Sequence, residues 1–229
     1  GLGKSAMQLA FADQVATHTG KPVLILAPLC VAQQTVREAQ RIGIADCRYA
    51  RTKALVIGSR IVVVNYEMLE HFAGIEWGGV VLDESSILKN FTGKTKQLLI
   101  SSFKTTPFKL ACTATPAPND YLELGNHAEF LDVMPSNEMI MRFFINDTMA
   151  AGSYRLKNHG RDDFWQWCAS WSVALTKPSD MGYADDRYQL PALQVQHISV
   201  STEGLPPIEG HLFRDSVLSE TTIHQEMRL

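Results

Sequence analysis

The feature that most constrains the fold of this 229-residue chain is the segment 78–90, which reads GGVVLDESSILKN. Two glycines precede an apolar, β-branched run that stops at two adjacent carboxylates, Asp83 and Glu84. This pattern is typical of a buried central strand that carries acids to the carboxyl edge of a parallel sheet. Paired acids at such an edge suit Mg²⁺ and an attacking water, but a buried strand that runs into a polar turn can also end in Asp or Glu by chance.

The N-terminal residues, GLGKS, match the last part of the phosphate-binding pattern G-x-x-x-x-G-K-[ST]. In that pattern the backbone N–H groups close on phosphate oxygens, the lysine neutralises the outer phosphates and the hydroxyl reaches Mg²⁺. A helix should follow with its N-terminus toward the anion, and residues 6–12 favour one. We expect the loop, and a strand before it, to begin upstream of this segment. The candidate nucleotide ligands are Gly1, Leu2, Gly3, Lys4 and Ser5.

Length and composition describe an ordinary globular protein, with 45% hydrophobic and 20% charged residues in one large domain or one and a half small ones. No apolar run approaches the roughly 18 residues of a membrane span, and the sequence shows no signal peptide. We therefore expect a cytoplasmic location and no membrane partner. The 4 cysteines are far apart without a C-x-x-C pair, so neither a zinc site nor a disulfide framework is expected.

The charge distribution leaves nucleic-acid binding open. A net charge of −3 argues against a protein that coats nucleic acid by bulk charge, but it does not exclude a local groove. No acidic residue lies between Glu84 and Asp120, and this stretch could form either a solvated helix face or such a groove. Its lysines are Lys89, Lys94, Lys96, Lys104 and Lys109.

Apolar runs alternate with amphipathic segments along the first half of the chain. This alternation predicts an α/β fold in which helices sandwich a parallel sheet whose ligands lie at the carboxyl edge of the strands. The expected strands are residues 23–27, 47–50, 61–65, 80–83 and 109–113. The expected helices begin at residue 6 and continue at 31–42, 67–70 and 94–102.

The pattern of apolar and polar residues changes after Asp120. Residues 121–131, 138–145 and 161–175 look helical, and residues 194–200 alternate as a strand does. The last of these helices concentrates aromatic residues that could stack on bases, but we favour an accessory helix packed on the edge of the sheet. They are Phe164, Trp165, Trp167 and Trp171. The expected domains are an ATP-binding lobe at 1–131, a helical accessory region at 132–190, and a linker with the beginning of a second lobe at 191–229.

Together these segments resemble the first RecA-like motor lobe of superfamily 2 helicases, nearest to Snf2-like DNA translocases of phage or prophage type. The segment GLGKS resembles motif I, and LAPL at 26–29 resembles motif Ia. The segment VNYEML at 64–69 resembles motif Ib, VLDESS at 81–86 with LKN behind it resembles motif II, and CTATP at 112–116 resembles motif III. Weaker matches at 177–180 and 190–191 resemble the region that leads to the second lobe.

The resemblance implies a role for each motif. Lys4 and Ser5 would hold the phosphates and Mg²⁺, Asp83 would position the metal, and Glu84 would orient or activate the attacking water. The residues implied in coupling the nucleotide to the grip on DNA are Ser86, Thr113, Ala114 and Thr115. Residues expected along the DNA backbone are Pro28, Tyr66 and Lys89.

The implied function is an ATP-dependent DNA helicase or translocase motor that uses ATP and Mg²⁺ in a bacterial or phage-infected cell. The expected partners are DNA, in duplex form, and a second RecA-like lobe, without which turnover should be poor because the arginine of that lobe would be missing. Three other functions stay open. They are the motor subunit of a restriction enzyme, a non-catalytic module that binds nucleotide or DNA, and a P-loop ATPase unrelated to nucleic acid.

Overall fold

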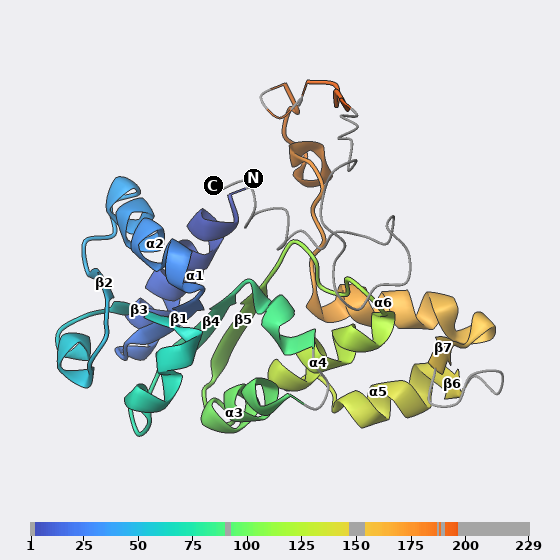
Figure 1. Cartoon of the computed structure of the whole chain (residues 1–229), viewed down its shortest axis with the longest axis horizontal. Coiled ribbons are helices and arrows are strands. Elements are labelled where there is room, and N and C mark those ends of the chain that lie inside the picture. The colour runs from blue at the N-terminus through green and yellow to red at the C-terminus, as the bar shows by residue number, and fades with distance from the viewer. Residues whose placement is uncertain (1–2, 90–92, 147–153, 187, 189–190, 197–229) are drawn as a thin grey trace, which may run out of the picture. The chain divides into compact units, whose positions relative to one another are not determined.

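The computed structural model describes residues 3–89, 93–146, 154–186, 188 and 191–196 (Figure 1). The chain divides into two compact units, Gly1–Asp185 and Asp186–Leu229. In the second unit the described residues contain neither a helix nor a strand. The strand predicted at 194–200 is therefore absent from 194–196, and its remainder lies outside the described residues.

The first unit is built on a five-stranded sheet with the order β2-β3-β1-β4-β5. All neighbouring strands are parallel, and β1 lies between β3 and β4, so that Ile25 pairs with both Val63 and Val81. The predicted parallel α/β fold is confirmed. The strands are β1 (Val23–Ala27), β2 (Cys47–Tyr49), β3 (Ile61–Asn65), β4 (Gly79–Asp83) and β5 (Phe108–Cys112).

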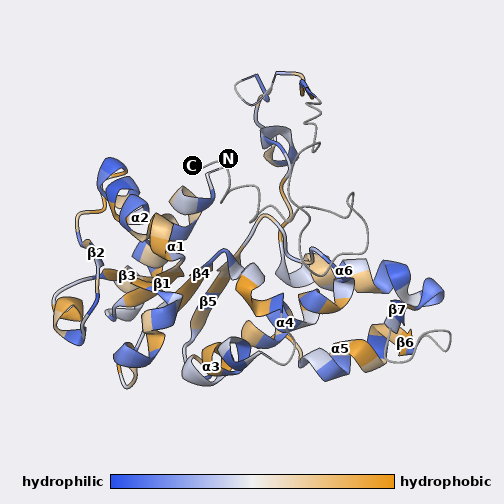
Figure 2. Ribbon diagram, in the orientation of Figure 1, coloured by the Kyte–Doolittle hydropathy of each residue, from blue (hydrophilic) through white to orange (hydrophobic). Residues whose placement is uncertain are grey.

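Helices cover both faces of this sheet because side chains alternate between the faces along each strand. Val23 and Ile25 of β1 pack into one cluster with the first two helices, whereas Leu24 and Leu26 pack on the opposite face. Figure 2 shows the central strands of the sheet as mainly hydrophobic. The elements of the first face are α1 (Lys4–Thr19) and α2 (Leu29–Arg41), and those of the second include the 3₁₀-helix η2 (Tyr66–Phe72) and α3 (Lys94–Ser102).

Several boundaries differ slightly from the sequence-based prediction. α2 begins at Leu29 because Pro28 ends β1 and stands at the N-cap, whereas we predicted residue 31. The short segment at 67–70 forms the longer 3₁₀-helix η2 rather than an α-helix. Two further 3₁₀-helices are η1 (Lys53–Val56) and η3 (Ser85–Lys89).

A second core lies in the accessory region that follows β5. Phe164 is completely buried there against Phe143 and Phe144, so the aromatic residues near 164 serve packing within this region itself. The elements are η4 (Tyr121–Glu123), α4 (Leu124–Phe130), α5 (Ser136–Phe143), β6 (Phe144–Asn146), β7 (Tyr154–Leu156), η5 (Asn158–Gly160), α6 (Arg161–Trp171) and η6 (Pro178–Met181).

The sequence-based helix boundaries were wrong at two points of this region. We predicted a helix to residue 145, but residues 144–146 pair antiparallel with 154–156 as a small hairpin that the sequence did not reveal. We also predicted a helix to residue 175, but α6 ends at Trp171, where Ser172 has an extended backbone. The Ser172 hydroxyl donates to the carbonyl of Cys168 at that point and helps to end the helix.

Candidate nucleotide site

The site is assembled at the carboxyl edge of the sheet, where parallel strands end side by side. Pro28 follows β1, Tyr66 follows β3, Glu84 follows β4 and Thr113 follows β5. These residues lie far apart in the sequence and on four different strands. The parallel topology therefore places four of the predicted motifs at one edge.

Lys4 is the first residue of α1 and contacts both predicted acids. Its Nζ atom lies 3.1 Å from Oδ1 of Asp83 and donates a hydrogen bond to Oε1 of Glu84. Gly3, just before the helix, has a φ of 82° and nothing within 4 Å of the place where a Cβ would lie. Its left-handed backbone, rather than lack of space, favours glycine at this turn.

Asp83 is buried and fixed from two sides. Gln8 Nε2 donates a 2.8 Å hydrogen bond to Asp83 Oδ1, and the Tyr66 hydroxyl donates a 2.7 Å hydrogen bond to the carbonyl of Asp83. The sequence did not reveal Gln8 as part of the site. Its position four residues after Lys4, on the same face of α1, is the signal that could have identified it.

Glu84 has a backbone conformation that is unusual for a residue with a side chain. Its φ is 53°, in the left-handed region, directly after the last residue of β4. Such conformations cost free energy and are found most often at functional sites. The Glu84 side chain is 45% exposed, so it remains accessible from solvent even while it pairs with Lys4.

The electrostatics of the site follow from this geometry. Burial alone would lower the pKa of Lys4, but the hydrogen bonds and charges of Glu84 and Asp83 outweigh it and raise that pKa. Burial, followed by the charges of Asp83 and Glu84, raises the pKa of Tyr66 well above its ordinary value. At neutral pH Lys4 is therefore positively charged, and the Tyr66 hydroxyl is neutral and donates a hydrogen bond.

The predicted coupling residues lie beside the acids, but their contacts differ from the expected ones. Among the described residues it is Ser85, not Ser86, that makes a long-range contact, with its Oγ 3.1 Å from Nε2 of the buried His127 on α4. The Thr115 backbone N–H donates to the Thr113 hydroxyl at 3.1 Å, which shapes the loop after β5, and Ala114 is exposed between them. Sequence reasoning did not single out His127.

The predicted DNA-facing residues do not share one environment. Tyr66 is only 8% exposed and its hydroxyl is used inside the site, so its side chain lies beneath the surface rather than on it. Lys89 is exposed at the end of η3, and its carbonyl accepts a hydrogen bond from Asn126 Nδ2 at 3.2 Å. Pro28 is half-buried at the start of α2.

The lysine-rich stretch is neither a continuous solvated face nor a single groove. Lys96 is 2% exposed and its Nζ lies 2.6 Å from Oε2 of Glu129. Lys109 pairs with Asp132, and its side chain is also nearly buried. Acids that follow the stretch in sequence therefore neutralise two of its lysines.

The site contains no cluster of three metal-ligating side chains, and neither does any other part of the described chain.

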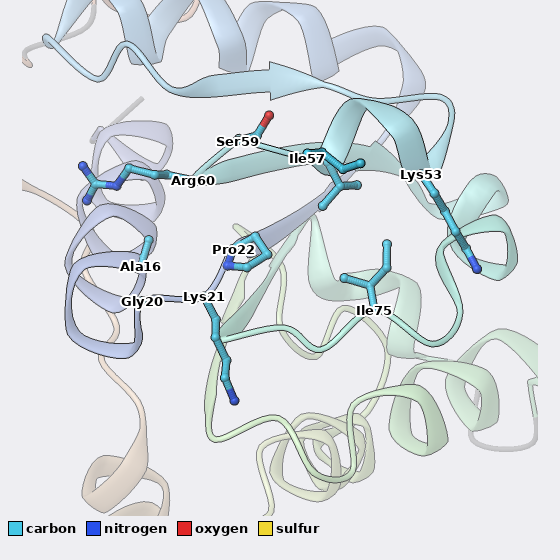
Figure 3. Close-up of a pocket in the computed structure, with 11 residues that line it drawn as sticks. Ala16, Gly20, Lys21, Pro22, Lys53, Ile57, Ser59, Arg60 and Ile75 are labelled. Carbon is cyan, nitrogen blue, oxygen red and sulfur yellow. The ribbon is translucent and has the colours of Figure 1, made fainter.

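A surface cavity of about 770 Å³ lies away from this site, at the end of α1 and the start of β1 and β3 (Figure 3). Gly20, Pro22 and Ser59 line it, and none of the residues of the sheet edge described above does. This cavity is therefore at the opposite, amino edge of the sheet.

The five-stranded parallel sheet flanked by helices has the RecA-like fold. It is similar to the SWI2/SNF2 ATPase core of Sulfolobus solfataricus, whose structure was solved in complex with double-stranded DNA. The TM-score is 0.53 at 24% sequence identity, over 62% of this chain and 32% of that chain. The chain thus has a Snf2-like fold.

Two curated proteins are similar in sequence. Protein p41 of Acyrthosiphon pisum secondary endosymbiont phage 1 is 31% identical over 157 residues, which cover 58% of this chain and 34% of p41. Chromatin remodeling factor mit1 of Schizosaccharomyces pombe (strain 972) is 28% identical over 176 residues, which cover 65% of this chain and 12% of mit1. The chain spans about a third or less of each. No protein-family model matches it.

None of the helices in the described part of the chain is long and apolar enough to cross a bilayer.

Proposed function

We propose that this chain is the ATP-binding half of a motor of the helicase or translocase type, which hydrolyses ATP with Mg²⁺ to move along DNA. The observation that carries the proposal is the meeting of Lys4, Asp83 and Glu84 at the carboxyl edge of the sheet. A lysine at the start of a helix and two carboxylates at the end of a strand provide a phosphate ligand, a metal ligand and a base within one site. The names of the similar proteins, a chromatin remodeling factor and an ATPase core bound to double-stranded DNA, support this choice.

The phosphates would lie at the N-terminus of α1. The left-handed turn at Gly3 and the first N–H groups of the helix suit an anion, and Lys4 would neutralise it. Gly1 and Leu2, which we also assign to this loop, lie outside the described residues. Because Lys4 pairs with two carboxylates, its ammonium would exchange these partners for phosphate oxygens when nucleotide binds.

Ser5 and Asp83 would hold Mg²⁺, which when bound would draw charge from the phosphates. Asp83 fits this role because both contacts from Lys4 and Gln8 are made to Oδ1, which leaves Oδ2 available among the described residues. The transfer of Lys4 to the phosphates would release Glu84. Its carboxylate would then orient the attacking water and accept its proton.

The grip on DNA would be formed beside this site. Pro28 and Lys89 would lie along the DNA backbone, where contacts with phosphates permit movement without sequence preference. Tyr66 would act from beneath, because its hydroxyl ties the start of η2 to the strand that carries Asp83. Ser86, Thr113, Ala114 and Thr115 would report the state of the nucleotide to this surface.

A second RecA-like lobe would complete the motor. The residues named above all come from one lobe, and in related P-loop enzymes a cationic residue from the other side of the nucleotide contributes about 10³–10⁵ in rate. We therefore expect this chain alone to bind Mg-ATP but to turn it over slowly. Stimulation by DNA should require both lobes.

The first test is nucleotide binding by this chain, measured by the fluorescence of a labelled ATP analogue. Lys4→Ala should abolish binding, whereas Lys21→Ala, which removes an exposed lysine just after the same helix, should not change it. Ser5→Ala should weaken the dependence of binding on Mg²⁺. Wild-type affinity in Lys4→Ala would overturn the assignment of the phosphate site.

The second test is steady-state ATP turnover by a two-lobe protein that contains this chain, with and without duplex DNA. Turnover should rise with DNA and vanish in Lys4→Ala, and Glu84→Gln should retain nucleotide binding while turnover stops. Turnover that is indifferent to DNA would instead favour an ATPase unrelated to nucleic acid. Nucleotide binding without any turnover would favour a non-catalytic module.

A further inference from the structure

A separate surface hollow of about 320 Å³ lies on the accessory region. It is enclosed by the start of η4, the β6-β7 hairpin and the beginning of α6. None of the residues assigned to the nucleotide or to the DNA backbone lines it. The function of the hollow is thus not accounted for by the site at the sheet edge.

One wall of the hollow is an aromatic ring that is both held in place and exposed. The Tyr121 ring meets the Trp165 ring edge-on, with centroids 5.1 Å apart, and lies 6.4 Å from the ring of the buried Phe164. Tyr121 nevertheless remains 45% exposed, and Tyr154 on β7, which also lines the hollow, is 39% exposed. An exposed ring that is fixed in advance, as that of Tyr121 is, suits the stacking of a nucleobase, and Tyr154 adds a second exposed ring.

The hollow is also cationic. Arg155, Lys157 and Arg161 line it, and Asp120 is its one carboxylate among the described lining residues. Asp120 is already engaged, because its Oδ1 accepts a hydrogen bond from the backbone N–H of Leu122 at 3.0 Å. An anionic ligand would therefore meet more positive than negative charge here.

The three cations do not have the same role. Lys157 Nζ donates to the carbonyls of Met141 and Arg142, at 2.9 and 2.8 Å, and so ties β7 to the end of α5. Arg155 and Arg161 are exposed, and the described part of the chain offers neither of them a hydrogen bond or an ion pair. Toward the described residues these two guanidinium groups are therefore unengaged, and their planar geometry suits the binding of phosphate.

We propose that this hollow binds an unpaired nucleotide of a single-stranded nucleic acid, with the base stacked on Tyr121 and Tyr154 and the flanking phosphates on Arg155 and Arg161. The hollow has room for a base but not for a double helix, whose bases would first have to leave the stack. This preference for single strands goes beyond the proposed motor, whose contacts follow the backbone of a duplex. It does not depend on ATP.

The test is the binding of a short fluorescein-labelled oligothymidylate to the whole chain without nucleotide, followed by fluorescence anisotropy. Tyr154→Ala and Tyr121→Ala should each weaken binding about tenfold, because stacking on an aromatic ring contributes on this scale. Tyr121→Phe, which keeps the ring, should restore affinity. Arg155→Gln and Arg161→Gln should each weaken binding and reduce the slope of log affinity against log salt by about 0.7, the value for one phosphate of a single strand.

A control variant shows whether a loss of binding is specific to the hollow. Arg48→Gln removes an exposed arginine from β2, at the far edge of the main sheet, and should leave affinity and salt slope unchanged. Binding is measured without nucleotide and none of the variants changes a residue of the nucleotide site, so that this proposal and the proposed motor can fail independently. The proposal is overturned if wild type does not bind the strand, if a duplex of the same length competes equally, or if Tyr154→Ala and the two arginine variants bind as wild type does.

Discussion

Gln8 holds Asp83 by a single hydrogen bond of 2.8 Å, from Nε2 to Oδ1, while its own Oε1 is buried without a hydrogen-bond partner among the described residues. The amide is therefore only half satisfied, and burying an unpaired oxygen costs free energy. The Gln8 amide also makes a side-chain hydrogen bond with Cys112, at the end of the neighbouring strand β5. Gln8 is therefore a positioning residue, whose side chain orients the carboxylate of the proposed metal ligand.

Gln8→Met should separate the role of this residue in the site from its role in stability. The substitution keeps the volume, removes the hydrogen bond to Asp83 and also removes the unpaired oxygen, so the free energy of unfolding should change by no more than about 1 kcal/mol. Mg²⁺-dependent nucleotide affinity should nevertheless fall severalfold, because Asp83 would no longer be oriented. Urea unfolding and titration with a labelled ATP analogue measure the two quantities. A large loss of stability with normal affinity would assign Gln8 to the core alone.

The backbone of Glu84 provides a second test, which compares two substitutions at one position. Glu84→Gly and Glu84→Ala both remove the carboxylate and its pairing with Lys4, but only glycine adopts a φ of 53° without strain. The glycine variant should therefore be more stable than the alanine variant by about 1 kcal/mol, as measured by urea unfolding. Both should lack ATP turnover. Equal stability of the two variants would show that the conformation at this position carries no strain.

Much of the main lobe could be predicted from the sequence because its strands are short, mostly apolar and separated by turn signals. The prediction that Asp83 and Glu84 end such a strand, together with the lysine at the start of the first helix, was sufficient to expect these three side chains at one sheet edge. The order of the strands could not be predicted in the same way. It depends on which strand pairs with which, and that information is not local.

The features that the sequence did not reveal depend on contacts over long distances in the chain. Gln8 contacts Asp83, which lies 75 residues away in the sequence. His127 contacts Ser85, which lies 42 residues away. Neither Gln8 nor His127 belongs to a sequence motif. The lysine-rich stretch contains no acid, yet Glu129 from outside it neutralises Lys96. Similarly, strands of three residues, such as those of the β6-β7 hairpin, are too short to produce a period.

Gly79 shows how closely α1 packs on the sheet. A Cβ atom at this position would lie 2.9 Å from Cγ1 of Val15 and 3.1 Å from the carbonyl oxygen of Phe108. Gly79→Ala should therefore reduce the free energy of unfolding by about 1–3 kcal/mol. Gly160→Ala is the matched control, because its Cβ would meet only Lys157 Cβ at 3.7 Å, and it should change stability by less than about 0.5 kcal/mol. Urea unfolding of both variants checks the difference.

The pair of the buried Lys96 and the partly buried Glu129 should stabilise the junction of α3, α4 and α5. Burial alone would raise the pKa of Glu129, but its hydrogen bonds with Lys96 and Ser136 outweigh burial and lower that pKa. The stabilisation is therefore present above pH 4.5, the ordinary value, and is lost as the pH falls through the lowered pKa of the folded state.

Glu129→Gln tests this pair directly. The substitution removes the negative charge beside the buried ammonium of Lys96, which keeps its hydrogen bonds to Asn126 and Ser136, and should reduce the free energy of unfolding at pH 7 by about 2 kcal/mol. Glu76→Gln makes the same change in the exposed pair with Lys21, where the Glu76 side chain is 80% exposed, and should have an effect within about 0.5 kcal/mol. Equal effects in the two variants would contradict a special role for the pair of Lys96 and Glu129.

His127 should make the region behind the acids sensitive to mildly acidic pH. Burial lowers the pKa of His127 below 6.5, against smaller opposing effects of Glu123 and Ser85. Below pH 6.5 His127 is therefore protonated in the unfolded chain but not yet in the folded one. As the pH decreases, the free energy of unfolding decreases by up to about 1.4 kcal/mol per pH unit, until the pH reaches the pKa of the folded state. His127→Gln removes this titration, and urea unfolding between pH 7 and the acid range should show a shallower pH dependence than in wild type. His159→Gln, at an exposed histidine, should keep the wild-type dependence, and a loss of pH dependence in that variant instead would place the proton elsewhere.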